Sequence, residues 1–267
     1  MSGFSADWLA LREPHDARAR NQAVLEAVIA ALKDVRHIRI VDLACGTGST
    51  LRALSPRLPA QQNWRLVDND LGLLARASAT TKPAGVSITT MPLDLNRDLE
   101  AVLDGPVDLI TTSALLDLVS EPWLERLAVE IVARSIPLYA GLSYDGRIEL
   151  SPTDQLDAAI VAAVNAHQRT DKGFGPALGP TAASIAIARF EALGYSVGHR
   201  KSDWVIGSHD REFQMEILSG WASAARDMGD LPLANTVEWL TRRRDAAGRS
   251  SIRVGHVDFF AAPMGTR

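Results

Sequence analysis

The stretch from His37 to Leu54, HIRIVDLACGTGSTLRAL, constrains the fold of this chain most strongly. Its first part, HIRIVDLA, is an apolar run typical of a buried strand, and STLRAL has the pattern of a helix. Gly46 and Gly48 lie in the turn between them, where glycine permits positive φ and close approach of a ligand to the backbone. A buried strand followed directly by a helix favours a parallel α/β sheet.

The alternation of strand and helix continues along the chain. WRLVDND reads as a strand and LGLLARAS as a helix, and the later strands are GVSITTMPLDL, VDLITTS, IPLYAGLSY, SVGHRKSDWVI and SIRVGHVDFFAAP. A short helical stretch after Asn96 and the helices EPWLERLAVEIVARS and TAASIAIARFEALGY separate some of these strands. We therefore predict an α/β fold with a Rossmann-like, doubly wound, mostly parallel sheet of seven strands.

The rest of the chain is predicted to complete a single domain over residues 1–267. Residues 1–36 form N-terminal helices, with Pro14 in the turn between two of them, and residues 37–144 form the core. Helical insertions follow the fifth and sixth strands. The first, residues 145–180, is a lid rich in glycine and proline at its end, and the second, residues 209–248, contributes two helices to the C-terminal half 181–267.

Composition narrows the classes of partner. The net charge of −4 gives no overall basic field, so nucleic acid is an unlikely partner. The only cysteine, Cys45, cannot form an internal disulfide, and the N-terminus lacks the apolar segment of a secretory signal. No apolar run approaches the roughly 18 residues of a membrane span. We expect a soluble, cytoplasmic protein without membrane contact, allow for a homodimer, and predict no metal because the histidines show no zinc-like spacing.

The acidic residues around the glycine turn indicate the ligand. Asp68 ends the second strand 20 residues after Gly48, the approximate spacing at which an acid meets an adenosine ribose. A dinucleotide motif would have a third glycine where this chain has Leu51, and Asp42 would repel a pyrophosphate but suits a cationic ligand. S-adenosylmethionine carries both a sulfonium and an ammonium group. A nicotinamide-dependent enzyme remains the alternative, and glycine would also suit any tight strand-to-helix turn.

Three motifs together resemble one family. VDLACGTG resembles the glycine-rich first motif of class I S-adenosylmethionine-dependent methyltransferases, LVDNDLGLL is similar to their acidic second-strand motif, and MPLDL resembles their third. The similarity covers roughly residues 41–144. It implies S-adenosylmethionine as the cofactor, with S-adenosylhomocysteine as its product, and it implies that GHVDFFAAP is a last strand inserted antiparallel near the end of the sheet.

The resemblance also implies the cofactor contacts. The methionine moiety would be held by Asp42 and the backbone of Ala44, Cys45, Gly46, Thr47 and Gly48. Asp68 would hold the ribose hydroxyls, and Asn69, Asp94 and Leu95 would surround the adenine. Ala44 stands where glycine is commoner, and its methyl group is expected to be tolerated at negative φ.

The segment TTSALLDLVSEPW suggests the substrate side. It lacks the Asn/Asp-Pro-Pro-aromatic sequence of family members that methylate exocyclic amino groups of bases. The resemblance makes Ser113 a cofactor neighbour and Asp117 a catalytic candidate facing the reaction centre, although Asp117 could equally cap a helix turn. His167 is a second candidate base, or else part of a solvated helix end. Arg12 or Arg20 could reach the methionine carboxylate, or could simply be solvated.

Substrate contacts are predicted at Tyr144, Arg169 and Lys172. With Arg147, the two cations favour an anionic acceptor. Other notable side chains are expected to be structural. His256 is predicted to be a packed core histidine, Trp204, Trp221 and Trp239 to pack the late helices, and Arg242 to Arg244 to favour a helix C-terminus.

The sequence therefore predicts transfer of a methyl group from S-adenosylmethionine to an oxygen or nitrogen of a small metabolite, an anionic one being favoured. An RNA or protein acceptor, or a non-catalytic scaffold that retains the cofactor fold, remains the alternative.

Overall fold

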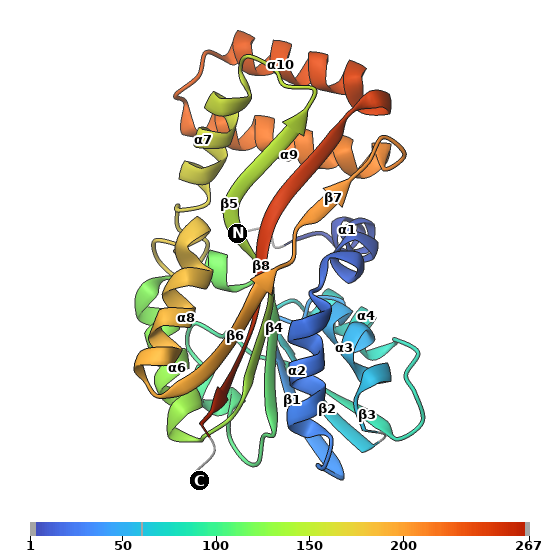
Figure 1. Ribbon diagram of the computed structural model, residues 1–267, viewed down its shortest axis with the longest axis vertical. Helices are drawn as coiled ribbons and strands as arrows, with labels where there is room; N and C mark the ends of the chain where they lie inside the picture. The colour runs from blue at the N-terminus through green and yellow to red at the C-terminus, as the bar shows by residue number, and fades with distance from the viewer. Residues whose placement is uncertain (1–3, 60, 265–267) are drawn as a thin grey trace.

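The computed structural model describes residues 4–59 and 61–264 and has an eight-stranded sheet at its centre (Figure 1). The strands are β1 (His37–Leu43), β2 (Gln61–Asp68), β3 (Val86–Pro92), β4 (Leu109–Ser113), β5 (Leu138–Ser151), β6 (Tyr195–Lys201), β7 (Trp204–Ile206) and β8 (Ser251–Pro263). Their order is β3-β2-β1-β4-β5-β8-β6, with β7 also paired to β8. Strands β1 to β5 are parallel, and β8 is antiparallel to β5, β6 and β7. The predicted α/β class and the antiparallel last strand are confirmed.

Helices cover both faces of the parallel part. On one face lie α2 (Gln22–Leu32), α3 (Ser49–Leu54) and α4 (Leu71–Ser78), and on the other α5 (Leu99–Val102), α6 (Glu121–Ala133) and α8 (Ala182–Ala192). Strand β1 shows why both faces are buried. Ile38 and Ile40 pack toward α2 and α3, whereas Val41 and Leu43 pack into the core of the opposite face.

A second lobe forms where β5 and β8 extend beyond the parallel strands. There α7 (Asp157–His167), α9 (Arg211–Met228) and α10 (Leu233–Ala246) surround the ends of β5, β7 and β8, at the top of Figure 1. Trp239 is fully buried in this lobe, and its Nε1 donates to Asp157 Oδ1 at 2.9 Å. Arg242 and Arg243 form ion pairs with Asp154 and Asp157. The predicted pair of late helices is confirmed, and these arginines join α10 to the start of α7.

Two strand predictions were wrong. The segment SVGHRKSDWVI forms β6 and β7 rather than one strand, because Ser202 turns inward and its N–H donates to His256 O at 2.9 Å. Strand β5 runs to Ser151, so residues 145–151 of the expected lid insertion are strand. Both β7 and the extension of β5 pair with the 13-residue β8, which pairs with β5 as far as Ser151 and with all of β7.

The N-terminal helices also differ from the prediction. Helix α1 (Ala6–Ala19) continues through Pro14, which lies on its exposed side, and the break comes at Arg20 and Asn21. The Asn21 side chain accepts the N–H groups of Ala23 and Val24, which caps α2. The turn is therefore fixed by a side-chain cap and not by proline.

A buried ionic cluster holds this turn against the sheet. The Asp258 carboxylate on β8 accepts the N–H of Asn21 at 2.8 Å, the N–H of Leu142 at 2.7 Å and the hydroxyl of Tyr139 at 3.2 Å. Arg20 donates to the same tyrosine hydroxyl at 3.1 Å. Leu142 lies at a register shift between β5 and β8 and has φ of 55°. The cluster thus joins the α1–α2 turn to a bulge in β5.

Replacing Asp258 with alanine should destabilise the protein by about 3 kcal/mol, since three donors would lose their acceptor and the buried Arg20 charge would lose a nearby negative charge. Urea unfolding measures the change. The matched control, Asp34→Ala at an exposed acid, should alter the free energy of unfolding by less than about 0.5 kcal/mol. Equal effects of the two substitutions would contradict the role given to the cluster.

Candidate active site

The loop between β1 and α3 presents its backbone to a cavity. Gly46 and Gly48 have φ of 54° and 84°, and a Cβ on Gly46 would lie 3.2 Å from Leu9 Cδ1 of α1. The expectation of negative φ at Ala44 was wrong, because this residue has φ of 52°. An alanine there costs roughly 1–2 kcal/mol. Hydrogen bonds after it hold the strained turn, from Cys45 N–H to Val67 O and from Gly46 N–H to the Asp68 carboxylate, each at 2.9 Å.

Asp68 fixes the loop against the end of β2. Its Oδ2 accepts the Gly46 N–H, and its Oδ1 accepts the Asp70 N–H at 3.0 Å. Asp70 in turn caps α4 by accepting the N–H groups of Gly72 and Leu73. The Asp68 side chain also lines the cavity, where its remaining lone pairs can accept hydrogen bonds from a ligand.

Asp42 lies beneath the loop and is fully buried. Its Oδ1 accepts the Thr111 hydroxyl at 2.7 Å, while Oδ2 has no hydrogen-bond partner among the described residues. Burial raises the pKa of Asp42 to about 7. A buried carboxylate oxygen without a donor, next to the loop, fits a ligand that brings positive charge.

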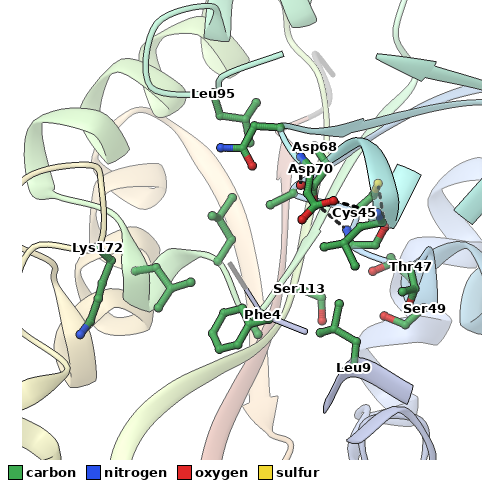
Figure 2. A pocket seen from close by; sticks show the side chains of 18 of the residues that line it. Phe4, Leu9, Cys45, Thr47, Ser49, Asp68, Asp70, Leu95, Ser113 and Lys172 are labelled. Atoms are coloured by element: carbon green, nitrogen blue, oxygen red, sulfur yellow. Dashed lines mark hydrogen bonds between the residues drawn. The ribbon is translucent and has the colours of Figure 1, made fainter. Parts of the chain in front are cut away.

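The cavity in front of the loop has a volume of about 560 Å³ (Figure 2). The predicted cofactor residues that line it are Arg12, Ala44, Cys45, Gly46, Thr47, Asp68, Asn69, Asp94, Leu95 and Ser113. Asp42, Gly48 and Arg20 are not among its lining residues. Figure 2 shows Thr47 and Ser49 on one side, Asp68 and Asp70 at one end, and Lys172 on the opposite side. The strand-end motifs therefore converge as their spacing predicted.

Other lining residues carried no sequence signal for a site. Phe4 and Leu9 come from the N-terminal segment, and Leu73 and Phe174 belong to other segments of the wall. Helix α1 is held over the loop by Arg52, which pairs with Glu13 and also donates to Thr47 O at 2.6 Å. An apolar side chain in a surface helix is indistinguishable, in sequence, from one that packs on the core.

The two predicted arginines have different surroundings. Arg12 lines the cavity, binds Asp16 through two hydrogen bonds of 2.9 and 3.2 Å, and lies over the Trp204 ring at 5.0 Å. Arg20 is buried behind the cavity and donates to Ser113 Oγ at 3.2 Å. Arg20 can therefore support a cavity residue, whereas only Arg12 meets the cavity itself.

A second cavity of about 580 Å³ lies toward the second lobe. It shares lining residues with the first, and these are Phe4, Arg12, Ala114, Leu118 and Lys172. Besides Lys172, three of the predicted substrate-side residues line it, namely Asp117, Tyr144 and His167. Trp204, Trp221 and His256 line it too, in addition to the packing role predicted for them. The two cavities therefore adjoin.

Asp117 is the buried carboxylate of the second cavity. It lies in the short 3-10 helix Leu116–Leu118 and is only 5% exposed. Its Oδ1 has no hydrogen-bond partner among the described residues, and burial raises the pKa of Asp117 to about 6. Because Oδ1 caps no N–H group, the structure favours the prediction that Asp117 faces the site over the prediction that it caps a helix turn.

His256 and Tyr144 are two further buried residues that line the second cavity. The His256 Nδ1 lies 3.1 Å from Val254 O, which only accepts, so Nδ1 carries the hydrogen and Nε2 is an acceptor. Burial lowers the pKa of His256 to about 3, so the ring is neutral. The Tyr144 hydroxyl donates to Asn165 Oδ1 at 2.7 Å. Both residues are buried, as predicted for the histidine.

The predicted cations do not gather at the second cavity. Lys172 lines both cavities, with Nζ 3.4 Å from His167 Nδ1, and burial together with Lys172 lowers the pKa of His167. Arg169 is exposed and is not among the lining residues described for either cavity. Arg147 is bound to Asp145 and Asp203. The grouping of three cations on which the anionic acceptor rested is therefore not present.

Comparison with known proteins gives the family. Residues 40–135, which contain the loop, Asp68 and Asp117, match the family model described as a methyltransferase domain. Residues 40–135 therefore form a methyltransferase domain, in line with the resemblance of the sequence motifs. No match to a curated protein sequence is found.

Solved structures agree on the fold of this methyltransferase. The YcgJ protein of Bacillus subtilis aligns over 92% of this chain and 100% of its own, with 14% identity and a TM-score of 0.51. A cyclopropane-fatty-acyl-phospholipid synthase-like protein from Lactobacillus casei aligns over 97% of this chain and 95% of its own, with 12% identity and a TM-score of 0.51. At these identities the likeness concerns the fold alone.

A membrane-spanning helix and a metal-binding cluster are both absent from the part of the chain that the structure describes. Within residues 4–59 and 61–264, no helix has both the length and the apolar composition needed to cross a membrane. In the same described ranges, no three histidine, cysteine, aspartate or glutamate side chains are grouped so that they could hold a metal ion.

Asp42 should make the stability of the methyltransferase depend on pH. Its pKa is about 7 in the folded state against 3.8 in the unfolded chain, so the folded state binds the proton more tightly. The stability that Asp42 contributes is therefore present below pH 4 and is lost as the pH rises toward 7. The free energy of unfolding of Asp42→Asn, relative to wild type, should increase by at least about 1 kcal/mol from pH 4 to pH 8.

Urea unfolding at the two pH values measures this difference, and Asp34→Asn at an exposed acid is the matched control. Asp117 titrates over a similar range in all three proteins and cancels in the comparison. Parallel pH profiles for wild type and Asp42→Asn would rule out the buried, uncompensated carboxylate.

Proposed function

We propose that this methyltransferase transfers a methyl group to an oxygen or nitrogen of a small molecule bound in the second cavity. The observation that carries the proposal is the junction between the cavities, where Phe4, Arg12 and Lys172 belong to both walls. A volume of about 580 Å³ is within the usual range of sites for small ligands, roughly 300–1,000 Å³.

The residues of the first cavity suit S-adenosylmethionine. Its sulfonium supplies an activated methyl group, so the protein needs to align the reactants and exclude water. Asp68 offers carboxylate lone pairs for the ribose hydroxyls, and Asn69, Asp94 and Leu95 line the part of the wall proposed for the adenine. Asp42 places negative charge beneath the loop.

Asp117 is the proposed general base. Its unpartnered Oδ1 can accept the proton of a hydroxyl or amine, and a pKa of about 6 leaves the carboxylate ionised at neutral pH. His167 is the second candidate, since Lys172 and burial favour its neutral form, which can also accept a proton. Lys172 is the remaining support for an anionic acceptor.

The assignment of Asp68 to the ribose predicts weaker binding of S-adenosylhomocysteine to Asp68→Ala. Loss of hydrogen bonds to a charged group should cost about 1–3 kcal/mol, which is roughly a 5- to 150-fold rise in Kd. Calorimetric titration measures it, and Asp104→Ala at an exposed acid outside the cavity is the control. Unfolding of both variants is measured as well, because Gly46 N–H loses its acceptor. An unchanged Kd in a folded Asp68→Ala would refute the assignment.

The role of Asp117 predicts a pH-dependent rate. Wild-type kcat/KM should rise as the pH passes about 6, because the carboxylate must be ionised to accept a proton. Asp117→Asn should lower kcat by about 100-fold or more, leave the Kd of S-adenosylhomocysteine unchanged, and lose this rise. His167→Gln should keep it. If the rise disappears in His167→Gln and persists in Asp117→Asn, the two assignments are exchanged.

The first experiment is a methyl-transfer screen with labelled S-adenosylmethionine against small molecules, unmodified RNA and unmethylated proteins. Transfer to a small molecule supports the proposal, and transfer confined to RNA or protein overturns it. Tight binding of S-adenosylhomocysteine without transfer to any class favours the scaffold alternative.

A further inference from the structure

The wall of the second cavity is strongly aromatic. Trp8, Trp204 and Trp221 line it from α1, β7 and α9, and Phe4 and Tyr144 add two more rings. Phe213 holds two of the tryptophans in place, since it stacks on Trp8 at 5.5 Å and meets the edge of Trp204 at 5.2 Å. An aromatic wall in which two rings are held by Phe213 favours a flat aromatic ligand, which can stack against these rings at little cost in side-chain entropy.

The polar atoms left without a partner at the buried end of this wall include two acceptors. Asp117 Oδ1 has no hydrogen-bond partner among the described residues, and His256 Nε2 accepts because Nδ1 donates to Val254 O. Two potential donors of the wall are already used, since Tyr144 donates to Asn165 and Trp204 Nε1 donates to Asp16. These two acceptors favour a ligand that brings a donor of its own.

The charges of the wall disfavour a carboxylate or phosphate at its centre. Arg12 is neutralised by its two hydrogen bonds to Asp16, and Glu216 joins Asp117 in the wall. Lys172 lies at the junction with the first cavity, across from Ser113 in Figure 2, and is shared with it. The anionic preference expected from the sequence is thus replaced by a preference for a neutral donor.

We propose that the methyl acceptor is a small aromatic molecule with a hydroxyl or amino group on its ring, and that this group donates its hydrogen to Asp117. The inference rests on the proposed function and specifies its substrate. In the reaction the O–H or N–H bond breaks and its proton passes to the Asp117 carboxylate. The electron pair of the oxygen or nitrogen forms the bond to the methyl carbon as the carbon–sulfur bond breaks, which leaves S-adenosylhomocysteine.

The test compares matched ligands on the protein saturated with S-adenosylhomocysteine. Calorimetry measures the binding of phenol, 2-naphthol and 4-phenylphenol, of the alcohols obtained by saturating their rings, and of their methyl ethers. At least one aromatic alcohol should bind tenfold or more tightly than both its saturated counterpart and its ether. Equal affinity for the saturated alcohol overturns the aromatic requirement, equal affinity for the ether overturns the donor, and no binding by the aromatic alcohols overturns both.

Variants of Trp221 test the wall directly, because no aromatic contact to another described ring holds this residue in place. Trp221→Leu should lose tenfold or more in affinity for the aromatic alcohol, whereas Trp221→Phe should retain most of it. Both should bind S-adenosylhomocysteine like wild type, which shows that they are folded. Equal affinities for the aromatic alcohol in the leucine and phenylalanine variants would contradict stacking.

The methyl-transfer screen separates failure of this inference from failure of the proposed function. Transfer to hydroxylated or aminated aromatic compounds supports both. Transfer only to aliphatic alcohols, amines or acids overturns the aromatic substrate and leaves the proposed function standing. Absence of transfer to any small molecule, by protein that binds S-adenosylhomocysteine, overturns the proposed function and this inference with it.

Discussion

The buried cluster of Asp258, Tyr139 and Arg20 connects the parts of the molecule that form both cavities. Asp258 belongs to β8, Tyr139 to β5, and Arg20 to the turn between α1 and α2. Arg20 also reaches Ser113 at the end of β4 and Thr50 in α3. A buried charge is costly unless it is fully paired, so this cluster permits few arrangements of the segments that carry it. The position of α1 over the loop depends on that constraint.

A buried carboxyl group lies at each of the two cavities. Beneath the first, Asp42 keeps an oxygen without a donor, and in the second Asp117 does the same. Burial raises the pKa of both carboxyls, to about 7 and about 6. One oxygen of each carboxyl thus has no donor among the described residues. The strained Ala44 and these two carboxyl groups lie around the site. Each lowers the stability of the fold locally, as is common where a protein binds a ligand.

Local patterns predicted the first cavity well and the second poorly. The glycine loop and Asp68 lie at strand ends whose order follows from the alternation of elements, so their convergence could be foreseen. The second cavity is built from α1, β5, α7, β7, α9 and β8, which lie far apart in the chain. The family resemblance indicated Asp117 and the polar composition of the insertion indicated His167, whereas Trp8 and Trp221 had no pattern to separate ligand contact from packing. Composition does not show that Arg147 will pair with Asp145 and Asp203, nor that the exposed Arg169 will lie outside the lining of both cavities.

The junction between the cavities has a consequence for how the two ligands bind. Phe4 and Arg12 contribute to both walls, and both come from the N-terminal segment that begins α1. A ligand in one cavity that fixes these side chains removes conformational freedom which the other ligand would otherwise have to restrict. The affinities of the two ligands are then thermodynamically linked, by the same factor in either direction. On the proposed function, the segment from Phe4 to Arg12 would couple the binding of the two ligands.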